Sequence, residues 1–310
     1  APRASRPGIA HRRPAGLIAD RRVAARQALH QPARHGPRRH PLTAERHPPG
    51  GGFALLFDPA RGRSVRPSPK RGQPMHLGIL QTGHVPDQVA ARDGTYGDLF
   101  ARLFAHRGFR LTTWSVVDMD FPDGPGAADA WLITGSRHGA YEDHPWIAPL
   151  ESLIRAIRDA RRPLVGICFG HQIIAQALGG RVEKFAGGWS VGRRIYEIGG
   201  RAVALNAWHQ DQVVAAPEGA TVLGHNDFTA AAVMAVGPRI LTVQPHPEFP
   251  ASVVETLIAH RAATVPGDRL DRARADLGQP TDDRMVADWL ADVLDGAPAT
   301  RVPFARAARA

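Results

Sequence analysis

The sequence has 310 residues, which is enough for one large domain or two small ones. Its net charge of +10 at pH 7 would suggest a nucleic acid or an anionic membrane as partner. However, residues 1–74 hold 16 Lys and Arg against 3 Asp and Glu, whereas the remainder holds 23 basic and 26 acidic residues. The basic charge therefore belongs to the first segment alone. Nucleic-acid binding is not favoured, because no aromatic side chains that could stack on bases are interleaved with these charges.

The single cysteine, Cys168, excludes an intramolecular disulfide and a multi-cysteine metal site. No apolar run approaches the roughly 18 residues of a membrane-spanning helix, and the run at 53–57 is too short for the core of a secretory signal. We therefore expect a cytoplasmic protein with no membrane partner, and no part of the sequence predicts a cofactor or a metal site.

Residues 1–74 are rich in Arg, Pro, His and Gly, and they contain 12 of the 27 prolines. No hydrophobic period of 2 or 3.6 persists there, which predicts a disordered extension. All four methionines lie at or after Met75, where a clear strand pattern begins. We expect the working protein to start at Met75. A transit peptide is the competing interpretation, although the Pro and His content fits it poorly.

From Met75 onward, predicted strands alternate with amphipathic helices. The strands are expected at 76–81, 109–117, 130–134 and 164–167, and the helices at 96–106, 146–159 and 170–178. Gly179-Gly180 is the glycine stop expected after the third helix. This alternation predicts parallel βαβ units in an open, doubly wound α/β sheet.

After Gly180, short β-type runs follow one another and predict an antiparallel extension of the same domain. These runs are 189–198, 202–205, 212–215, 221–225, 230–236 and 240–243, followed by helices at 252–261 and 282–294. We expect one domain at 75–262. Residues 263–310 are expected to form a linker, a C-terminal helix that docks on the domain, and a tail.

Cys168 lies at a strand-to-helix junction in the pattern Gly166-Ile167-Cys168-Phe169-Gly170. Such a nucleophile elbow projects the reactive side chain above the sheet, and its glycines let the backbone pack closely. The N-terminus of the following helix favours the thiolate form, and the N–H of Phe169 is placed to donate to an oxyanion. The alternative is that Cys168 is an unreactive buried residue, but the flanking glycines, the preceding strand and the following helix disfavour it.

A second motif, Pro245-His246-Pro247-Glu248, follows the strand predicted at 240–243. His246 would take the thiol proton and later protonate the leaving group. Glu248 would orient the imidazole and stabilise its cation. The flanking prolines restrict the backbone on both sides of His246. An isolated motif of this kind is commonly a surface loop, but beside an elbow it indicates a catalytic triad.

These motifs resemble the class I, or triad, glutamine amidotransferases, from about Met75 to Phe249. The matching stretches are 133–136, 166–172, 178–180 and 246–248. The resemblance implies a flavodoxin-like fold and a triad of Cys168, His246 and Glu248. Sequence features around Ser136 and at 140–143 are most similar to the stand-alone, GMP-synthase-like branch, which includes γ-glutamyl peptide hydrolases.

The resemblance also implies further site residues. The second oxyanion donor comes from the loop Gly135-Ser136, and Gln172 lines the substrate pocket. A looser match is the loop that contacts the α-amino and α-carboxylate groups of the substrate, here His209, Gln210 and Asp211. His171 lies between matched positions, and we expect it on the surface of its helix.

The predicted activity is hydrolysis of the glutamine side-chain amide through a γ-glutamyl thioester, which releases ammonia. Because the residues after Phe249 are too few for a synthase domain, the ammonia would go to a synthase partner in trans. Two alternatives remain: a stand-alone hydrolase of γ-glutamyl peptides or amides, and a catalytically silent regulatory protein on the same fold.

Overall fold

The computed structural model describes residues 73–305 of the chain, so the disorder predicted for most of 1–74 lies outside the described residues. The strands are β1 (His76–Leu80), β2 (Arg110–Trp114), β3 (Ala130–Ile133), β4 (Leu164–Ile167), β5 (Arg181–Lys184), β6 (Ser190–Ile198), β7 (Arg201–His209), β8 (Asp211–Ala215), β9 (Ala220–His225), β10 (Val233–Val236) and β11 (Ile240–Val243). The α-helices are α1 (Asp87–Asp93), α2 (Tyr96–Leu103), α3 (Ile147–Asp159), α4 (Phe169–Ala177), α5 (Ala251–His260), α6 (Gly267–Ala275) and α7 (Asp283–Leu294). Two 3₁₀ turns, η1 (Ala105–Arg107) and η2 (Val116–Asp118), flank β2.

The main sheet of the described residues has nine strands in the order β2-β1-β3-β4-β11-β10-β9-β6-β7. The first five pair in parallel, and the remaining strands extend the sheet through antiparallel pairs. A separate two-stranded sheet joins β5 to β8. The predicted α/β fold with an antiparallel extension is therefore confirmed, and the strand order of the parallel half is that of flavodoxin-like sheets.

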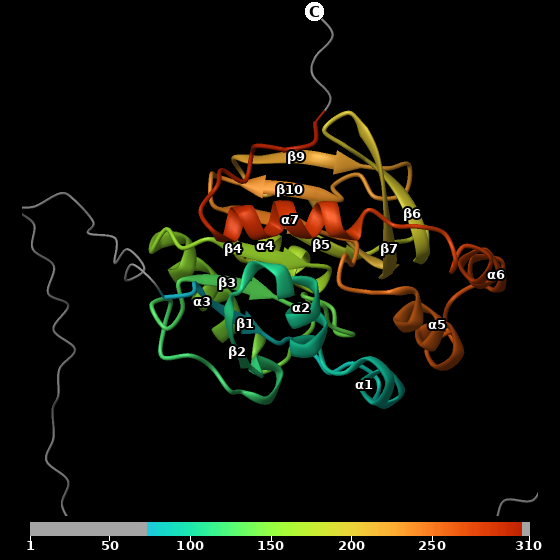
Figure 1. Ribbon diagram of the computed structural model, residues 1–310, viewed down its shortest axis with the longest axis horizontal. Helices are drawn as coiled ribbons and strands as arrows, with labels where there is room; N and C mark the ends of the chain where they lie inside the picture. Colours follow the sequence, from blue (N-terminus) through green and yellow to red (C-terminus); the bar gives the residue numbers. More distant parts are fainter. Residues whose placement is uncertain (1–72, 306–310) are drawn as a thin grey trace, which may run out of the picture. The chain divides into compact units, whose positions relative to one another are not determined.

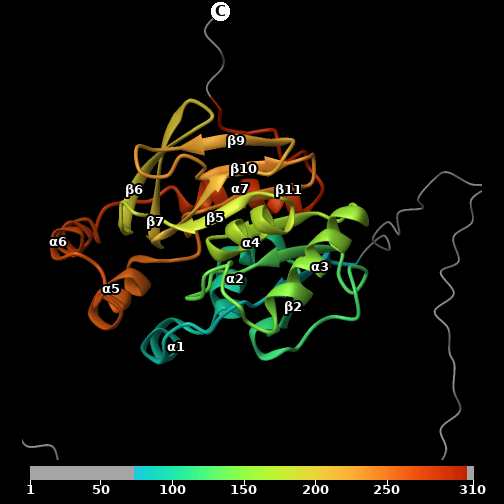
Figure 2. The same ribbon diagram turned by 180° about the vertical axis from the view of Figure 1, so that it is seen from behind.

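Helices cover both faces of the parallel half, α2 and α7 on one face and α3 and α4 on the other (Figures 1 and 2). The central strands β3, β4 and β11 are buried along their whole length, as continuous apolar runs predict for a doubly covered sheet. Two hydrophobic clusters, one on each side of the sheet, make up the core. Among the described residues, no helix is both long enough and apolar enough to cross a bilayer.

Helix α4 is buried more completely than its sequence predicts. His171 is fully buried and its Nδ1 lies 2.8 Å from Thr242 Oγ1, so the expectation that it lies on the helix surface is wrong. The reason is that α4 contacts β4 and β11 on one side and α3 on the other, which leaves the first turns no solvent face. The helix ends as expected: Gly179 takes the positive φ of +96°, and the N–H of Gly180 donates to Ala175 O at 2.7 Å.

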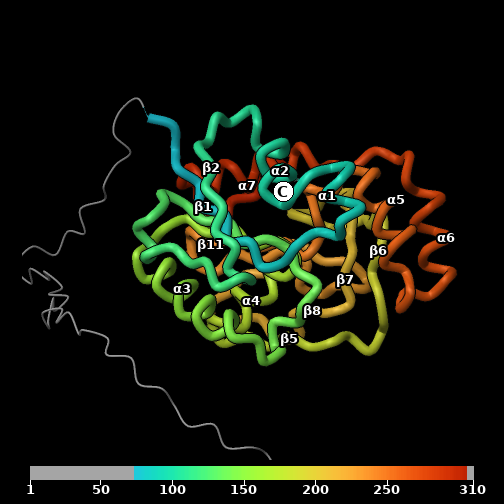
Figure 3. Tube along the Cα trace, turned by 90° about the horizontal axis from the view of Figure 1, so that it is seen from below, coloured from blue at the N-terminus to red at the C-terminus, as the bar shows by residue number. Residues whose placement is uncertain are grey.

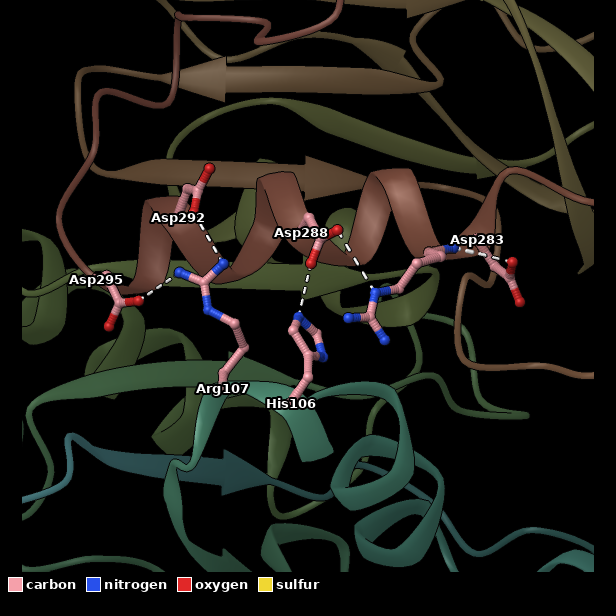
Figure 4. Close-up of polar contacts among 7 residues, drawn as sticks. His106, Arg107, Asp283, Asp288, Asp292 and Asp295 are labelled. Atoms are coloured by element: carbon pink, nitrogen blue, oxygen red, sulfur yellow. Dashed lines mark hydrogen bonds and ion pairs between the residues drawn. The ribbon is translucent and has the colours of Figure 1, made fainter.

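The C-terminal helix α7 packs against β4 and β11 through an apolar face. Its buried residues are Val286, Ala287, Trp289, Leu290, Ala291, Val293 and Leu294. Figure 4 shows its opposite, acidic side facing η1. There Arg107 contacts Asp292 at 2.9 Å and Asp295 at 2.6 Å, and His106 Nε2 lies 2.6 Å from Asp288. Apolar burial and ion pairs thus hold the C-terminal helix on the sheet.

Candidate active site

The predicted site residues gather at the carboxyl edge of the parallel strands. Gly135-Ser136 follow β3, Cys168 follows β4 and His246 follows β11, and these three strands are neighbours in the sheet. Ligands of open α/β sheets bind at this edge, because the loops leaving adjacent strands meet there.

Cys168 has an unusual backbone, with φ +51° and ψ −100°. A non-glycine residue in this region costs about 1–3 kcal/mol, so surrounding contacts must hold it there. Its N–H donates to Val243 O at 2.9 Å, and its carbonyl accepts from the N–H of Gln172 at 3.1 Å. The elbow is therefore anchored to β11 on one side and to the first turn of α4 on the other.

The two glycines of the elbow allow a very close approach of the backbones. A Cβ atom on Gly166 would lie 2.5 Å from the carbonyl oxygen of Gly170, and one on Gly170 would lie 2.3 Å from the carbonyl oxygen of Ile133. Both distances are far below the ordinary carbon–oxygen contact of about 3.3–3.6 Å. Glycine is therefore required at both positions for β3, β4 and α4 to meet at Cys168.

His246 is held between the sheet and Glu248. Its N–H donates to Asn206 O at 2.8 Å, and its ring stacks on Phe249 at 4.0 Å between centroids with 5° between the planes. Nδ1 lies 2.8 Å from Glu248 Oε1, and both side chains are buried. The ring is also hydrogen-bonded to Cys168. The imidazole thus has a carboxylate on one side and the thiol on the other.

The charge state of His246 follows from these neighbours. Burial by itself lowers the pKa of the imidazole, but the charges of Cys168 and Glu248 and the hydrogen bonds to both raise that pKa to about 10. Tyr96, which stacks on Phe249, has a pKa well above its usual value because it is buried and faces the negative charges of Glu248 and Cys168. A protonated imidazole beside the sulfur is the arrangement that stabilises a thiolate.

A cavity of about 360 Å³ lies in front of the sulfur. Its lining includes seven of the predicted site residues, namely Ser136, Cys168, Gln172, His209, Gln210, Asp211 and His246. The other three predicted residues, Gly135, Phe169 and Glu248, do not line it. The side chain of Phe169 is fully buried against Trp146, and only its backbone N–H, at the first position of α4, could serve a ligand.

A group of polar residues in the lining, which we call the polar wall, is held in fixed positions by hydrogen bonds. Gln172 Nε2 donates to Asp211 O at 2.9 Å, and Asp211 Oδ2 accepts from the Tyr141 hydroxyl at 3.1 Å. Burial raises the pKa of Asp211. His209 Nδ1 lies 3.2 Å from the carbonyl of Asp211, so this nitrogen carries the proton. Its Nε2 is then an acceptor, buried and without a hydrogen-bond partner among the described residues. Burial lowers the pKa of His209 to about 3 and keeps the ring neutral.

Sequence reasoning missed the outer part of the cavity, which runs between α1 and α5. These two helices lie side by side although they are far apart in the sequence (Figure 3). The apolar side chains that they and the preceding loop contribute are Val85, Pro86, Val89, Val253 and Leu257. No local signal marks them: α1 buries only Val89, so it has no helical hydrophobic period to detect.

Comparisons with known proteins agree with this fold. The family model described as glutamine amidotransferase class-I matches residues 102–262. Gamma-glutamyl peptidase 5 of Arabidopsis thaliana is 30% identical over 209 residues, which cover 62% of this chain and 83% of that protein. The glutamine-hydrolyzing GMP synthase of Clostridium acetobutylicum is 34% identical over 137 residues, but these cover only 24% of that protein and 38% of this chain.

Solved structures show the same architecture. A glutamine amidotransferase from Methylobacillus flagellatus superposes with a TM-score of 0.56 at 21% identity, covering 72% of this chain and 93% of that one. A glutamine amidotransferase from Thermotoga maritima gives 0.54 at 20% identity, covering 71% and 96%. The family model spans more than half of the sequence, and the chain belongs to the class I glutamine amidotransferase family. Its relatives include both γ-glutamyl peptidases and GMP synthases.

Proposed function

We propose that this protein is a cysteine hydrolase of γ-glutamyl amide bonds, with glutamine as the simplest substrate. The observation that carries the proposal is the buried arrangement of Cys168, His246 and Glu248 at the edge of a 360 Å³ cavity. A thiol, an imidazole hydrogen-bonded to it, and a carboxylate on the far imidazole nitrogen are the parts that nucleophilic acyl transfer requires.

In the proposed reaction, the Cys168 thiolate attacks the δ-carbonyl carbon of the substrate. The oxyanion of the tetrahedral intermediate accepts hydrogen bonds from the backbone N–H groups of Ser136 and Phe169. Protonated His246 donates its proton to the leaving ammonia or amine, and a γ-glutamyl thioester forms. Neutral His246 then takes a proton from water, which attacks the thioester. Glutamate leaves, and the thiolate–imidazolium pair is restored as the sulfur departs.

The substrate's amino-acid end would bind at the polar wall of the cavity. The Asp211 carboxylate supplies the negative charge that an α-ammonium group needs, and the buried His209 Nε2 is an acceptor that lacks a partner. Gln210, on the same wall, has a side-chain amide for the α-carboxylate. Gln172 fixes this wall through its bond to the Asp211 carbonyl. Its role is therefore to position Asp211.

A second candidate substrate is a γ-glutamyl peptide, and the apolar part of the cavity favours it. Ammonia needs no room beside the sulfur, whereas the space between α1 and α5 is lined by side chains such as Val89 and Leu257 that suit a bulkier leaving amine. The relative named gamma-glutamyl peptidase points in the same direction. The alternative is that the same reaction supplies ammonia to a synthase partner in trans; a glutamine-hydrolyzing GMP synthase is among the relatives.

The test is to assay the purified full chain with glutamine, with γ-glutamyl dipeptides and with an α-glutamyl dipeptide as negative control. We expect Cys168→Ala to lower turnover of the γ-glutamyl substrates by at least about 10⁴-fold, because loss of a nucleophile removes the covalent path. Glutamine turnover within tenfold of the parent in Cys168→Ala would refute the assignment. Activity only on glutamine and only with an added partner would favour the synthase-coupled role over the peptidase.

A further inference from the structure

Three potential metal ligands lie together on the loop between β3 and α3. His138, Glu142 and His144 each place one ligand atom within 4.8 Å of the other two, and they form the one such group found within residues 73–305. Glu142 Oε2 lies 2.8 Å from His144 Nε2 and 3.5 Å from His138 Nδ1. Two imidazole nitrogens and one carboxylate oxygen are the donor set of three-ligand zinc sites.

The spacing of these atoms suits a tetrahedral ion. With zinc–ligand bonds of about 2.0–2.1 Å, two ligand atoms on a tetrahedral ion lie about 3.3 Å apart. The two distances to Glu142 lie on either side of this value. Small rotations of the two rings would therefore bring all three atoms to one ion, with the fourth position left to water.

The surrounding structure already orients the ligands. The N–H of Glu142 donates to Gly139 O at 3.1 Å, and the N–H of His144 donates to Glu142 O at 3.1 Å. The indole of Trp146 stacks parallel to His144 with 5.8 Å between centroids and 6° between planes, and it meets His138 edge-on. Trp146 itself is buried. The ligands thus come from one short hydrogen-bonded turn braced by a rigid aromatic ring.

The cluster also adjoins the candidate active site. His138 and Glu142 line the cavity that contains Cys168, and the N–H of His138 donates to Ser136 Oγ at 3.1 Å. We propose that His138, Glu142 and His144 bind one divalent transition-metal ion, Zn²⁺ by their chemistry, at the mouth of this cavity. The bound ion would hold the loop that carries Ser136.

The test measures metal binding and needs no catalytic activity, so its failure is separate from failure of the proposed function. It uses the full chain as Cys168→Ala, which removes the thiol as a competing zinc ligand. Co²⁺ absorption reports the coordination geometry, and calorimetry with Zn²⁺ reports the number of ions bound. Five histidines precede residue 73, so only the difference between variants is interpreted.

We expect His138→Ala/His144→Ala in this background to lose one equivalent of Zn²⁺ and the tetrahedral Co²⁺ bands. The matched control is His225→Ala, which removes an imidazole 4.0 Å from the carboxylate of Glu197 and should keep both. Glu142→Gln serves as a second variant if the double alanine variant misfolds, and it should weaken binding by at least about tenfold. Equal zinc stoichiometry and affinity in the parent and in both ligand variants, or no binding in the parent, would overturn the proposal.

Discussion

Gly170→Ala is the substitution for which the structure makes the sharpest prediction, because two general rules oppose each other at this position. Gly170 lies inside α4, where alanine is normally favoured over glycine by about 1 kcal/mol. The added methyl group would, however, lie 2.3 Å from Ile133 O and 2.9 Å from Ile133 C. These are backbone atoms at the end of β3, so rotation of a side chain cannot relieve the clash.

The magnitude follows from the distance. To restore a carbon–oxygen contact of about 3.3–3.6 Å, α4 and the end of β3 must separate by about 1 Å. Overpacking of this kind costs typically about 1–3 kcal/mol of stability, which exceeds the helix-propensity gain. Cys168 lies at the start of α4 and Ser136 three residues beyond Ile133, so the shift also separates the proposed nucleophile from the proposed oxyanion donor. A displacement of about 1 Å between reacting groups can cost 10²-fold in rate.

The assay compares kcat/KM for a γ-glutamyl substrate and the urea midpoint in Gly170→Ala, Gly267→Ala and the parent. Gly267 is the matched control, since it also lies in a helix but a Cβ there meets no atom within 4 Å. We expect Gly267→Ala to keep the activity of the parent and to be as stable as the parent or up to about 1 kcal/mol more stable. If Gly170→Ala folds with unchanged stability and unchanged kcat/KM, the account of the elbow is wrong.

Two further predictions concern charge. Burial lowers the pKa of His171 to about 3, whereas the unfolded chain protonates this residue below about 6.5. The unfolded state therefore binds more protons in this window, and the free energy of unfolding falls by up to about 2 kcal/mol from pH 7 to pH 5 because of this group. In urea unfolding, His171→Gln should lose that share of the pH dependence; an unchanged dependence contradicts the reasoning. Arg107→Ala should cost about 1 kcal/mol at low salt and less at 1 M NaCl, because its carboxylate partners are partly exposed. In thermal unfolding, the exposed pair of Arg158 and Asp159 provides the control, and a salt-independent loss at Arg107 would point to packing instead.

Elements with a strong hydrophobic period were predicted well, and elements without one were missed. Helix α3 was expected at 146–159 and runs Ile147–Asp159, because five apolar residues share one face. Helix α6 was not expected, because only Leu270 and Ala273 of its nine residues are buried. Strand β5 was missed for the same reason, since Val182 is its single buried residue. A pattern of apolar residues reports how much of an element is buried, so weakly buried elements leave little trace in it.

In the candidate site, too, the residues with a local sequence signal were predicted, and those placed only by tertiary packing were not. Glycines around Cys168 allow close backbone packing and prolines around His246 restrict the backbone, so the sequence alone could propose roles for both residues. The place of Tyr96 beside the candidate site could not be predicted from the sequence. Its hydroxyl comes near Gly135 only because of the way in which α2 packs in the tertiary fold. The prediction of a surface position for His171 was wrong because the spacing of apolar residues cannot show that a helix is covered on both sides, as α4 is.

The loop between β3 and α3 connects the two proposals. It carries Ser136, whose backbone N–H is the proposed oxyanion donor, and within eight residues it also carries the histidines and the glutamate of the proposed metal site. In a parallel sheet, the strand ends fix Cys168 and His246 through the hydrogen bonds of β4 and β11. Beyond Thr134, side chains hold the loop after β3: Thr82 Oγ1 donates to Gly135 O at 3.1 Å, and Gln176 Nε2 donates to Ala140 O at 2.7 Å. The position of the proposed oxyanion donor therefore depends on side-chain contacts rather than on the backbone hydrogen bonds of the sheet. An ion that joins His138 to His144 would add a further constraint to this loop, within a few residues of the proposed oxyanion donor.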